Sequence, residues 1–232
     1  MSKKEETVGS REIKVLTRSV GGKVHLPEQA GLVRTESTLE SDFALSHARP
    51  GGAHVKSQPL TIEFVDSAGK TRRYTPDFLV VHPPAADGRQ PSPQLVETKY
   101  RSELDRNAAK YAEKFRAAER YALDRGWQFV VRTEEDVRGT ELNNLKFLML
   151  YARSPLPDAL IWERVQISVR RLGEATVREV LADLDPDPAV QMRLLPHLWQ
   201  QVLHRTLQVD LSRPLNMRTR LGYLPELFGE SR

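Results

Sequence analysis

The sequence lacks cysteine altogether, so disulfide bonds and thiolate metal sites are excluded. It has no apolar run of the length that a membrane-spanning helix needs. Residues 1–6 are polar, unlike the start of a secretory signal. Histidines are few, and we interpret His47, His54 and His82 as surface residues because none is paired at ligand spacing. We therefore expect a cytoplasmic protein that has no membrane partner.

The chain of 232 residues has room for one large domain or two small ones, each able to bury a core. Charged residues make up 28% and hydrophobic residues 39%, which is ordinary for a globular protein. The formal net charge is +4 and the isoelectric point is near 9.4. This balance favours a polyanionic partner.

Two short stretches, residues 74–80 and 96–99, contain the side chains with the clearest chemical meaning. Both are rich in aromatic, β-branched and aliphatic residues, which is typical of strands. Asp77 stands at the head of the first strand. Glu97 and Lys99 are two residues apart on the second, so side-chain alternation places both on one face. The sequence therefore predicts that these three side chains meet at one end of a small sheet.

Two carboxylates at such a place can hold a hard divalent cation such as Mg²⁺ through oxygen ligands. A lysine beside them can orient a water molecule or balance charge at a phosphate. The simpler alternative is a turn aspartate and a solvated Glu–Lys pair on an edge strand. The apolar runs at residues 78–81 and 95–96 favour the metal site, because buried carboxylates are costly unless they are paired, protonated or metal-bound.

A third carboxylate, Glu40, lies in a predicted helix at residues 35–45. Leu39 and Phe43 give this helix its apolar positions, and Thr35 or Ser37 can cap its start. Taken alone, Glu40 is a solvated helix residue. With Asp77 and Glu97 in view, it becomes a candidate for a further carboxylate at the same metal site.

The pattern predicts an α/β fold, with a mixed sheet flanked by helices. A long amphipathic helix is predicted to begin at Ser102, which caps it, and to end at Gly126. We interpret its basic face, which includes Lys114, as solvated, with contact to a DNA backbone as the second possibility. The strands are expected at 54–66, 71–81, 94–99 and 127–131, with a hairpin turn at 67–70 and a loop at 82–93.

A helix at 143–151 closes the first predicted domain, residues 1–152, and a linker at 154–157 leads into the second, residues 153–232. The second domain has helices at 176–184 and 189–207, then two wing strands at 207–211 and 218–223. This order is typical of a winged-helix-like module. Two interpretations stay open: Arg213, Arg218 and Arg220 contact DNA phosphates, or the module docks a protein on a basic surface.

The ordered motifs resemble the TnsA family within the PD-(D/E)xK nuclease superfamily, the endonuclease subunits of heteromeric cut-and-paste transposases. The resemblance implies a restriction-endonuclease-like fold. It implies that Glu40, Asp77 and Glu97 bind Mg²⁺, for which Mn²⁺ can substitute, and that Lys99 is the catalytic lysine. Some members have glutamine where Glu97 stands. The motifs lie at residues 36–40, 58–62, 74–80, 95–99, 133–138 and 144–145.

The resemblance also implies a prokaryotic protein that cuts double-stranded DNA at the 5′ ends of a transposon. Its partners would be a TnsB-like transposase subunit, which acts on the 3′ ends, and a TnsC-like regulatory ATPase. Two alternatives remain. One is a stand-alone restriction-like or junction-resolving nuclease, and the other is a non-catalytic adaptor, with a nuclease fold, that binds DNA or protein.

Overall fold

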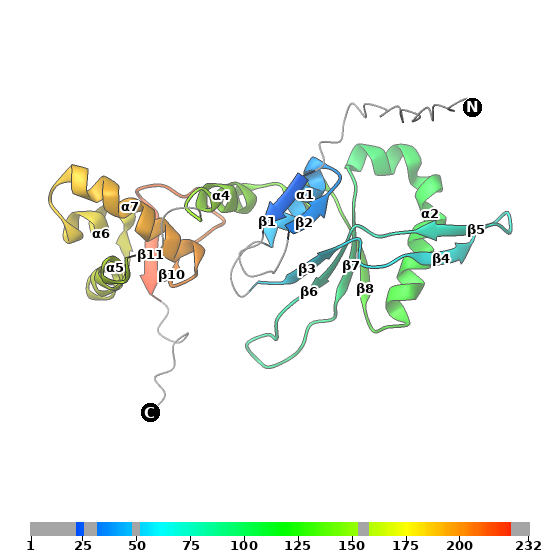
Figure 1. Ribbon diagram of the computed structural model, residues 1–232, viewed down its shortest axis with the longest axis horizontal. Helices are drawn as coiled ribbons and strands as arrows, with labels where there is room; N and C mark the ends of the chain where they lie inside the picture. Colours follow the sequence, from blue (N-terminus) through cyan, green and yellow to red (C-terminus); the bar gives the residue numbers. More distant parts are fainter. Residues whose placement is uncertain (1–21, 26–31, 48–51, 153–157, 224–232) are drawn as a thin grey trace, which may run out of the picture.

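The computed structural model describes residues 22–25, 32–47, 52–152 and 158–223. It shows two lobes joined through one helix, α4 (Figure 1). The N-terminal lobe comprises the elements from β1 to α3, and the C-terminal lobe comprises those from α5 to β11. None of the described helices is long and apolar enough to cross a membrane.

A four-stranded mixed sheet forms the centre of the N-terminal lobe, with the strand order β3-β6-β7-β8. The first two pairings are antiparallel, and β7 and β8 are parallel because α2 crosses between them. This arrangement confirms the predicted mixed sheet flanked by helices. The elements are β3 (His54–Ser57), β6 (Phe78–Val81), β7 (Gln94–Thr98), α2 (Arg101–Leu123) and β8 (Gln128–Arg132).

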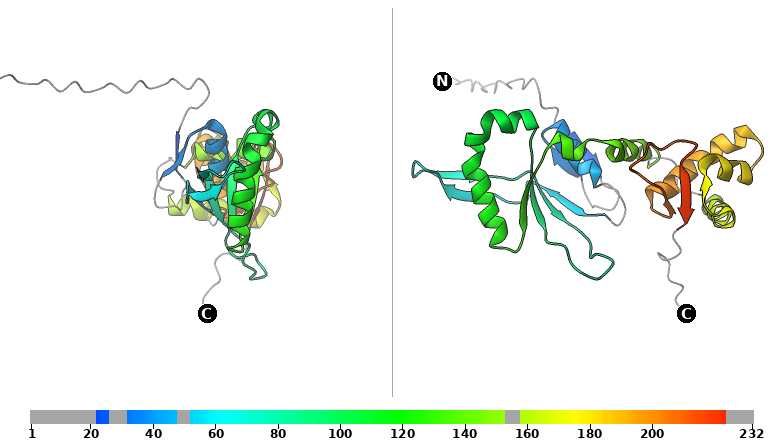
Figure 2. Two further views of the ribbon diagram at one scale, coloured as in Figure 1. Left: turned by 90° about the vertical axis from the view of Figure 1, so that its right-hand side faces the viewer. Right: turned by 180° about the vertical axis from the view of Figure 1, so that it is seen from behind.

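Side-chain alternation divides this sheet between two cores. Phe78 and Val96 pack on one face with α1 (Thr38–Ser46). Leu95 packs on the other face with Ala118 of α2. Glu97 is two residues beyond Leu95 in β7, so it lies on the α2 face. The views in Figure 2 show α2 covering this side of the sheet.

The entry to α1 follows the sequence prediction. Ser37 is the N-cap, and its hydroxyl accepts a hydrogen bond of 3.1 Å from the backbone N–H of Glu40. Before it, β1 (Gly22–His25) and β2 (Leu32–Thr35) form an antiparallel pair. Residues 1–21 and 26–31 of the predicted first domain lie outside the described residues.

The sequence predicts one strand within residues 54–66, and the structure has two separate strands there. Gln58 has a φ of 45°, in the left-handed region, and Pro59 has no N–H to donate, so the strand breaks between them. The return strand also divides, after Tyr74. The result is a separate hairpin of β4 (Ile62–Val65) and β5 (Thr71–Tyr74), which extends past α2 (Figure 1).

The long helix α2 starts before the predicted cap at Ser102. Its N-cap is Tyr100, whose side chain makes no capping hydrogen bond. Instead, the N–H of Arg101 donates to the carboxylate of Glu134, 2.9 Å away, in α3 (Glu134–Val137). The predicted stop is confirmed: Gly126 has a φ of 70°, and Trp127 N–H donates back to the carbonyl of Ala122.

In the C-terminal lobe, three helices surround a core that includes the fully buried Trp199. A three-stranded sheet of order β10-β11-β9 completes it. The helix α5 was not predicted, although Asp158 caps it and Val165 and Val169 repeat at helical spacing. The elements are α5 (Ala159–Leu172), β9 (Ala175–Thr176), α6 (Val177–Leu184), α7 (Pro188–Leu203), β10 (Leu207–Gln208) and β11 (Arg220–Tyr223).

Thr176, at the predicted start of the helix, caps α6. The helix α7 ends four residues before the predicted Leu207, and both wing strands are shorter than predicted. The expected linker at 154–157 lies outside the described residues. The connecting helix α4 (Thr140–Met149) takes part in both lobes. Leu142 belongs to the N-terminal core and Leu148 to the C-terminal core.

Candidate active site

The three side chains that the strand pattern predicted to converge do meet at one edge of the sheet. In the antiparallel pairing of β6 and β7, Phe78 lies opposite Val96, so Asp77 falls beside Glu97. The Lys99 ammonium lies 3.1 Å from Oε1 of Glu97 and 3.9 Å from Oδ2 of Asp77. Two carboxylates and an ammonium group therefore share one corner between the sheet and α2.

Asp77 is held by contacts on one of its two carboxylate oxygens. Oδ2 accepts hydrogen bonds from the N–H of Thr98 at 2.7 Å and from its hydroxyl at 2.8 Å. Among the residues that the structure describes, none donates to Oδ1. The backbone carbonyl of Asp77 accepts from the N–H of Gln58 at 2.8 Å, so the strand break at Gln58 also fixes the head of β6.

The pKa of Asp77 lies well above the ordinary value for an aspartate. Burial and the nearby charge of Glu97 raise the pKa of Asp77 to about 6, although Lys99 and the Thr98 hydrogen bond act in the opposite direction. Its side chain is only 17% exposed. A cation beside Oδ1 would favour the ionised carboxylate.

Glu97 has partners on both of its oxygens. Its side chain is 2% exposed, and Oε1 is ion-paired with Lys99 and accepts a hydrogen bond of 2.8 Å from Lys114 of α2. Oε2 accepts a hydrogen bond of 2.7 Å from the hydroxyl of Tyr74, at the end of β5. Sequence reasoning assigned no role to Tyr74 and placed Lys114 on a solvated face. The spacing of Lys114 could have indicated its position. It follows the buried Tyr111 by three residues, which places it beside the apolar stripe of α2.

Glu40 lies close by, but its carboxylate binds a backbone N–H in the structure. Its carboxylate accepts a hydrogen bond of 2.7 Å from the N–H of Glu36, at the N-terminal end of α1, where the helix dipole favours negative charge. Glu40 and Lys99 line a common pocket of about 640 Å³ together with Glu103 and Arg106. Across the described residues, no group of three or more acidic or histidine side chains is arranged to hold a metal ion. The structure therefore does not join Glu40 to Asp77 and Glu97 as one ligand cluster.

The residues present fit a hard divalent cation in the type of donor, since carboxylate oxygens are the ligands that Mg²⁺ prefers. The number of available ligand atoms fits only partly. Oδ1 of Asp77 accepts from no described residue, whereas both carboxylate oxygens of Glu97 already have protein partners. Two lysines balance the two carboxylates, so the corner is close to neutral without any further ion. Asp77 is thus the residue of this corner best placed to hold a metal.

A mixed sheet covered by helices, with an acidic and basic corner at its edge, fits a nuclease fold. Residues 53–134 match the family described as TnsA-like endonuclease N terminal. This stretch, which includes Asp77, Glu97 and Lys99, is a TnsA-like endonuclease domain, and the resemblance predicted from the motifs is confirmed there. No curated protein matches the chain.

Proposed function

We propose that this protein is the Mg²⁺-dependent DNA endonuclease subunit of a heteromeric cut-and-paste transposase, and that it cuts the 5′ ends of the transposon. The observation that supports the chemistry best is the meeting of Asp77, Glu97 and Lys99 at one sheet edge, inside the matched domain. The transposase assignment rests on the family and on the ordered motifs.

In this proposal Asp77 would hold the ion, Glu97 would be the second carboxylate beside it, and Glu40 would support the site from the wall of the pocket. When bound, Mg²⁺ lowers the pKa of a water molecule and stabilises charge on the phosphate oxygens. Lys99 is 21% exposed and lines the pocket, so its ammonium group can donate to a phosphate or to the attacking water. Asp77 must be ionised for this role, which a cation beside it favours.

The C-terminal lobe would contact DNA and the partner subunits, a TnsB-like transposase and a TnsC-like ATPase. The element order α5-β9-α6-α7-β10-β11, with β11 central in the sheet, supports a winged-helix-like module. Arg218 is exposed there, but Arg213 lies 3.4 Å from Asp210 and Arg220 lies 3.6 Å from Glu174. This mixed charge keeps protein docking as an alternative to phosphate contact.

The test compares wild-type protein with Asp77→Ala on a supercoiled plasmid that carries transposon ends, with Mg²⁺ or Mn²⁺ and with the partner subunits. We expect Asp77→Ala to lower the nicking rate by about 100-fold or more, as loss of a group that stabilises the transition state does. Asp87→Ala is the matched control, because Asp87 is an exposed aspartate in the loop after β6. Equal nicking by Asp77→Ala and wild type refutes the proposal.

A second arm of the experiment leaves out the partner subunits. The transposase assignment predicts little cleavage under that condition. Efficient cutting by the protein alone, again abolished by Asp77→Ala, points instead to a stand-alone nuclease of the same superfamily.

A further inference from the structure

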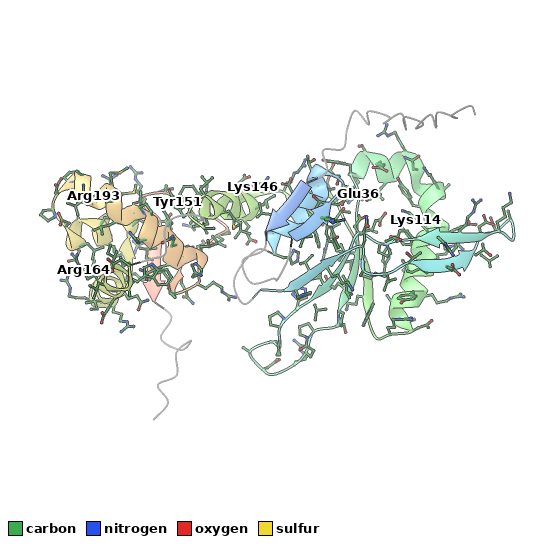
Figure 3. The ribbon with its side chains drawn as sticks, in the orientation of Figure 1. Glu36, Lys114, Lys146, Tyr151, Arg164 and Arg193 are labelled. Carbon is green, nitrogen blue, oxygen red and sulfur yellow. The ribbon has the colours of Figure 1, made fainter. Side chains whose placement is uncertain are left out.

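Lys114 lies outside the sequence motif, yet its contact with Glu97 is shorter than that of Lys99, the other described lysine that pairs with this carboxylate. Its ammonium group is 2.8 Å from Oε1 of Glu97, and the side chain is 22% exposed. Figure 3 labels Lys114 on α2, the helix that covers this face of the sheet. The ammonium also lies over the rings of Tyr74 and Tyr111, 4.5 and 4.7 Å from their centroids. Ion pairing and cation–π contacts thus hold Lys114 in one place.

Tyr74 contacts the other carboxylate oxygen of Glu97. Its hydroxyl donates a hydrogen bond of 2.7 Å to Oε2 of Glu97. Glu97 is held between the end of β5 and the middle of α2, two elements that lie outside its own sheet.

In this geometry the two lysines have different roles. A carboxylate that is 2% exposed needs a compensating charge, because an unpaired buried charge is strongly destabilising. Lys114 supplies that charge from a site among aromatic rings. Lys99 opens onto the pocket and reaches towards Asp77 as well, so it does not have to stay with Glu97.

We propose that Lys114 is a positioning residue. Together with Tyr74 it fixes the carboxylate of Glu97 and so leaves Lys99 available to the reacting phosphate. The role in catalysis rests on the proposed nuclease function, whereas the role in holding Glu97 rests on the contacts alone.

Three full-length variants test this role: Lys114→Met, Lys114→Arg, and Lys70→Met as the control, since Lys70 is an exposed lysine in the β4–β5 turn. We expect Lys114→Met to lower kcat for nicking about 10-fold to 100-fold, the usual effect of losing a residue that orients a ligand. The KM for DNA should stay close to the wild-type value. Lys114→Arg should recover most of the loss, and Lys70→Met should behave as wild type.

A crystal structure of Lys114→Met gives the second readout. We expect the Glu97 carboxylate to leave the position in which Tyr74 and Lys99 both reach it. If Glu97 keeps those two contacts, or if Lys114→Met nicks DNA as fast as Lys70→Met, the inference is overturned. Inactivity of the wild-type protein would instead count against the proposed function, and the position of Glu97 in the variant would still decide the positioning role.

Discussion

Asp77 shows how a single side chain acquires its properties from neighbours that lie far from it in the chain. Its partners Thr98 and Lys99 come from β7 and the residue after it, and Gln58 holds its backbone from the end of β3. The fold keeps this carboxyl group poorly solvated and close to the charge of Glu97. Its folded-state pKa of about 6 therefore lies above the ordinary value of 3.8.

This shift predicts a pH dependence of stability when divalent ions are absent. The folded protein retains a proton on Asp77 at pH values where the unfolded chain has released it. Its contribution to stability is therefore full below the unfolded pKa of 3.8 and is lost as the pH rises through about 6. Asp77→Asn removes this dependence.

We expect urea titrations to show the difference directly. Relative to wild type, Asp77→Asn should be more stable at pH 7.5 than at pH 3.5 by about 3 kcal/mol, the equivalent of a shift of roughly two pKa units. Asp87→Asn, at an exposed position, should show no such change with pH. A stability difference for Asp77→Asn that is constant across this range contradicts the assignment.

Between elements, a charged network links α1 to α4 and to the start of α2. Asp42 of α1 accepts from Arg138 at 2.7 Å and lies 2.6 Å from the ammonium of Lys146 on α4. The same guanidinium donates to the hydroxyl of Tyr100, the residue that follows Lys99. Burial acts to raise the pKa of Asp42, but the hydrogen bonds from Lys146 and Arg138 outweigh it, so that pKa is lowered.

We predict that Asp42→Ala lowers the free energy of unfolding by about 1–2 kcal/mol, measured by urea titration. The loss is smaller than for a fully buried pair because Arg138 and Lys146 are 42% and 46% exposed and can turn to water. Glu63→Ala is the control, since Glu63 pairs with Arg73 on the surface of the hairpin. Equal losses for the two variants would show that the network does not join the helices.

For the protein as a whole, the arrangement of the two lobes depends on α4. Figure 3 labels Lys146 on this helix, where it lies between them. The buried Asn144 donates from its side-chain nitrogen to the carbonyls of Leu211 and Arg213, at 2.8 and 2.7 Å. Its side-chain oxygen accepts from the N–H of Leu215 at 3.0 Å. One amide thereby fixes the loop before β11 to a helix whose first half packs in the N-terminal lobe.

We predict that Asn144→Ala loosens this connection. Three backbone groups would lose their partner, so the free energy of unfolding should fall by about 2–4 kcal/mol. Amide hydrogen exchange should become faster in residues 211–215. The neighbouring Asn143 is exposed, and Asn143→Ala should change stability by less than about 0.5 kcal/mol. Unchanged exchange in residues 211–215 of Asn144→Ala would show that other contacts hold the loop.

The sequence predicted those features that depend on local pattern. The cap at Ser37, the stop at Gly126 and the hairpin turn follow from nearby residue types, and the alternation of β7 placed Glu97 and Lys99 on one face. It did not predict the break at Gln58, because the alternation of Leu60, Ile62 and Phe64 continues the strand pattern beyond it. It also missed α5, although Val165 and Val169 lie at helical spacing.

Much of the candidate site was therefore set by the chain on its own: the identity of Asp77, Glu97 and Lys99, and the strand periodicity that brings them to one edge. Tertiary structure alone decided which partners surround them. Lys114 reaches Glu97 only because α2 packs back across the sheet, and Tyr74 reaches it only because the hairpin turns away after Pro59. The carboxylate of Glu40 accepts from a backbone N–H, while its charge still contributes to the raised pKa of Asp77. Contacts of this kind join residues that are distant along the chain, so no local pattern records them.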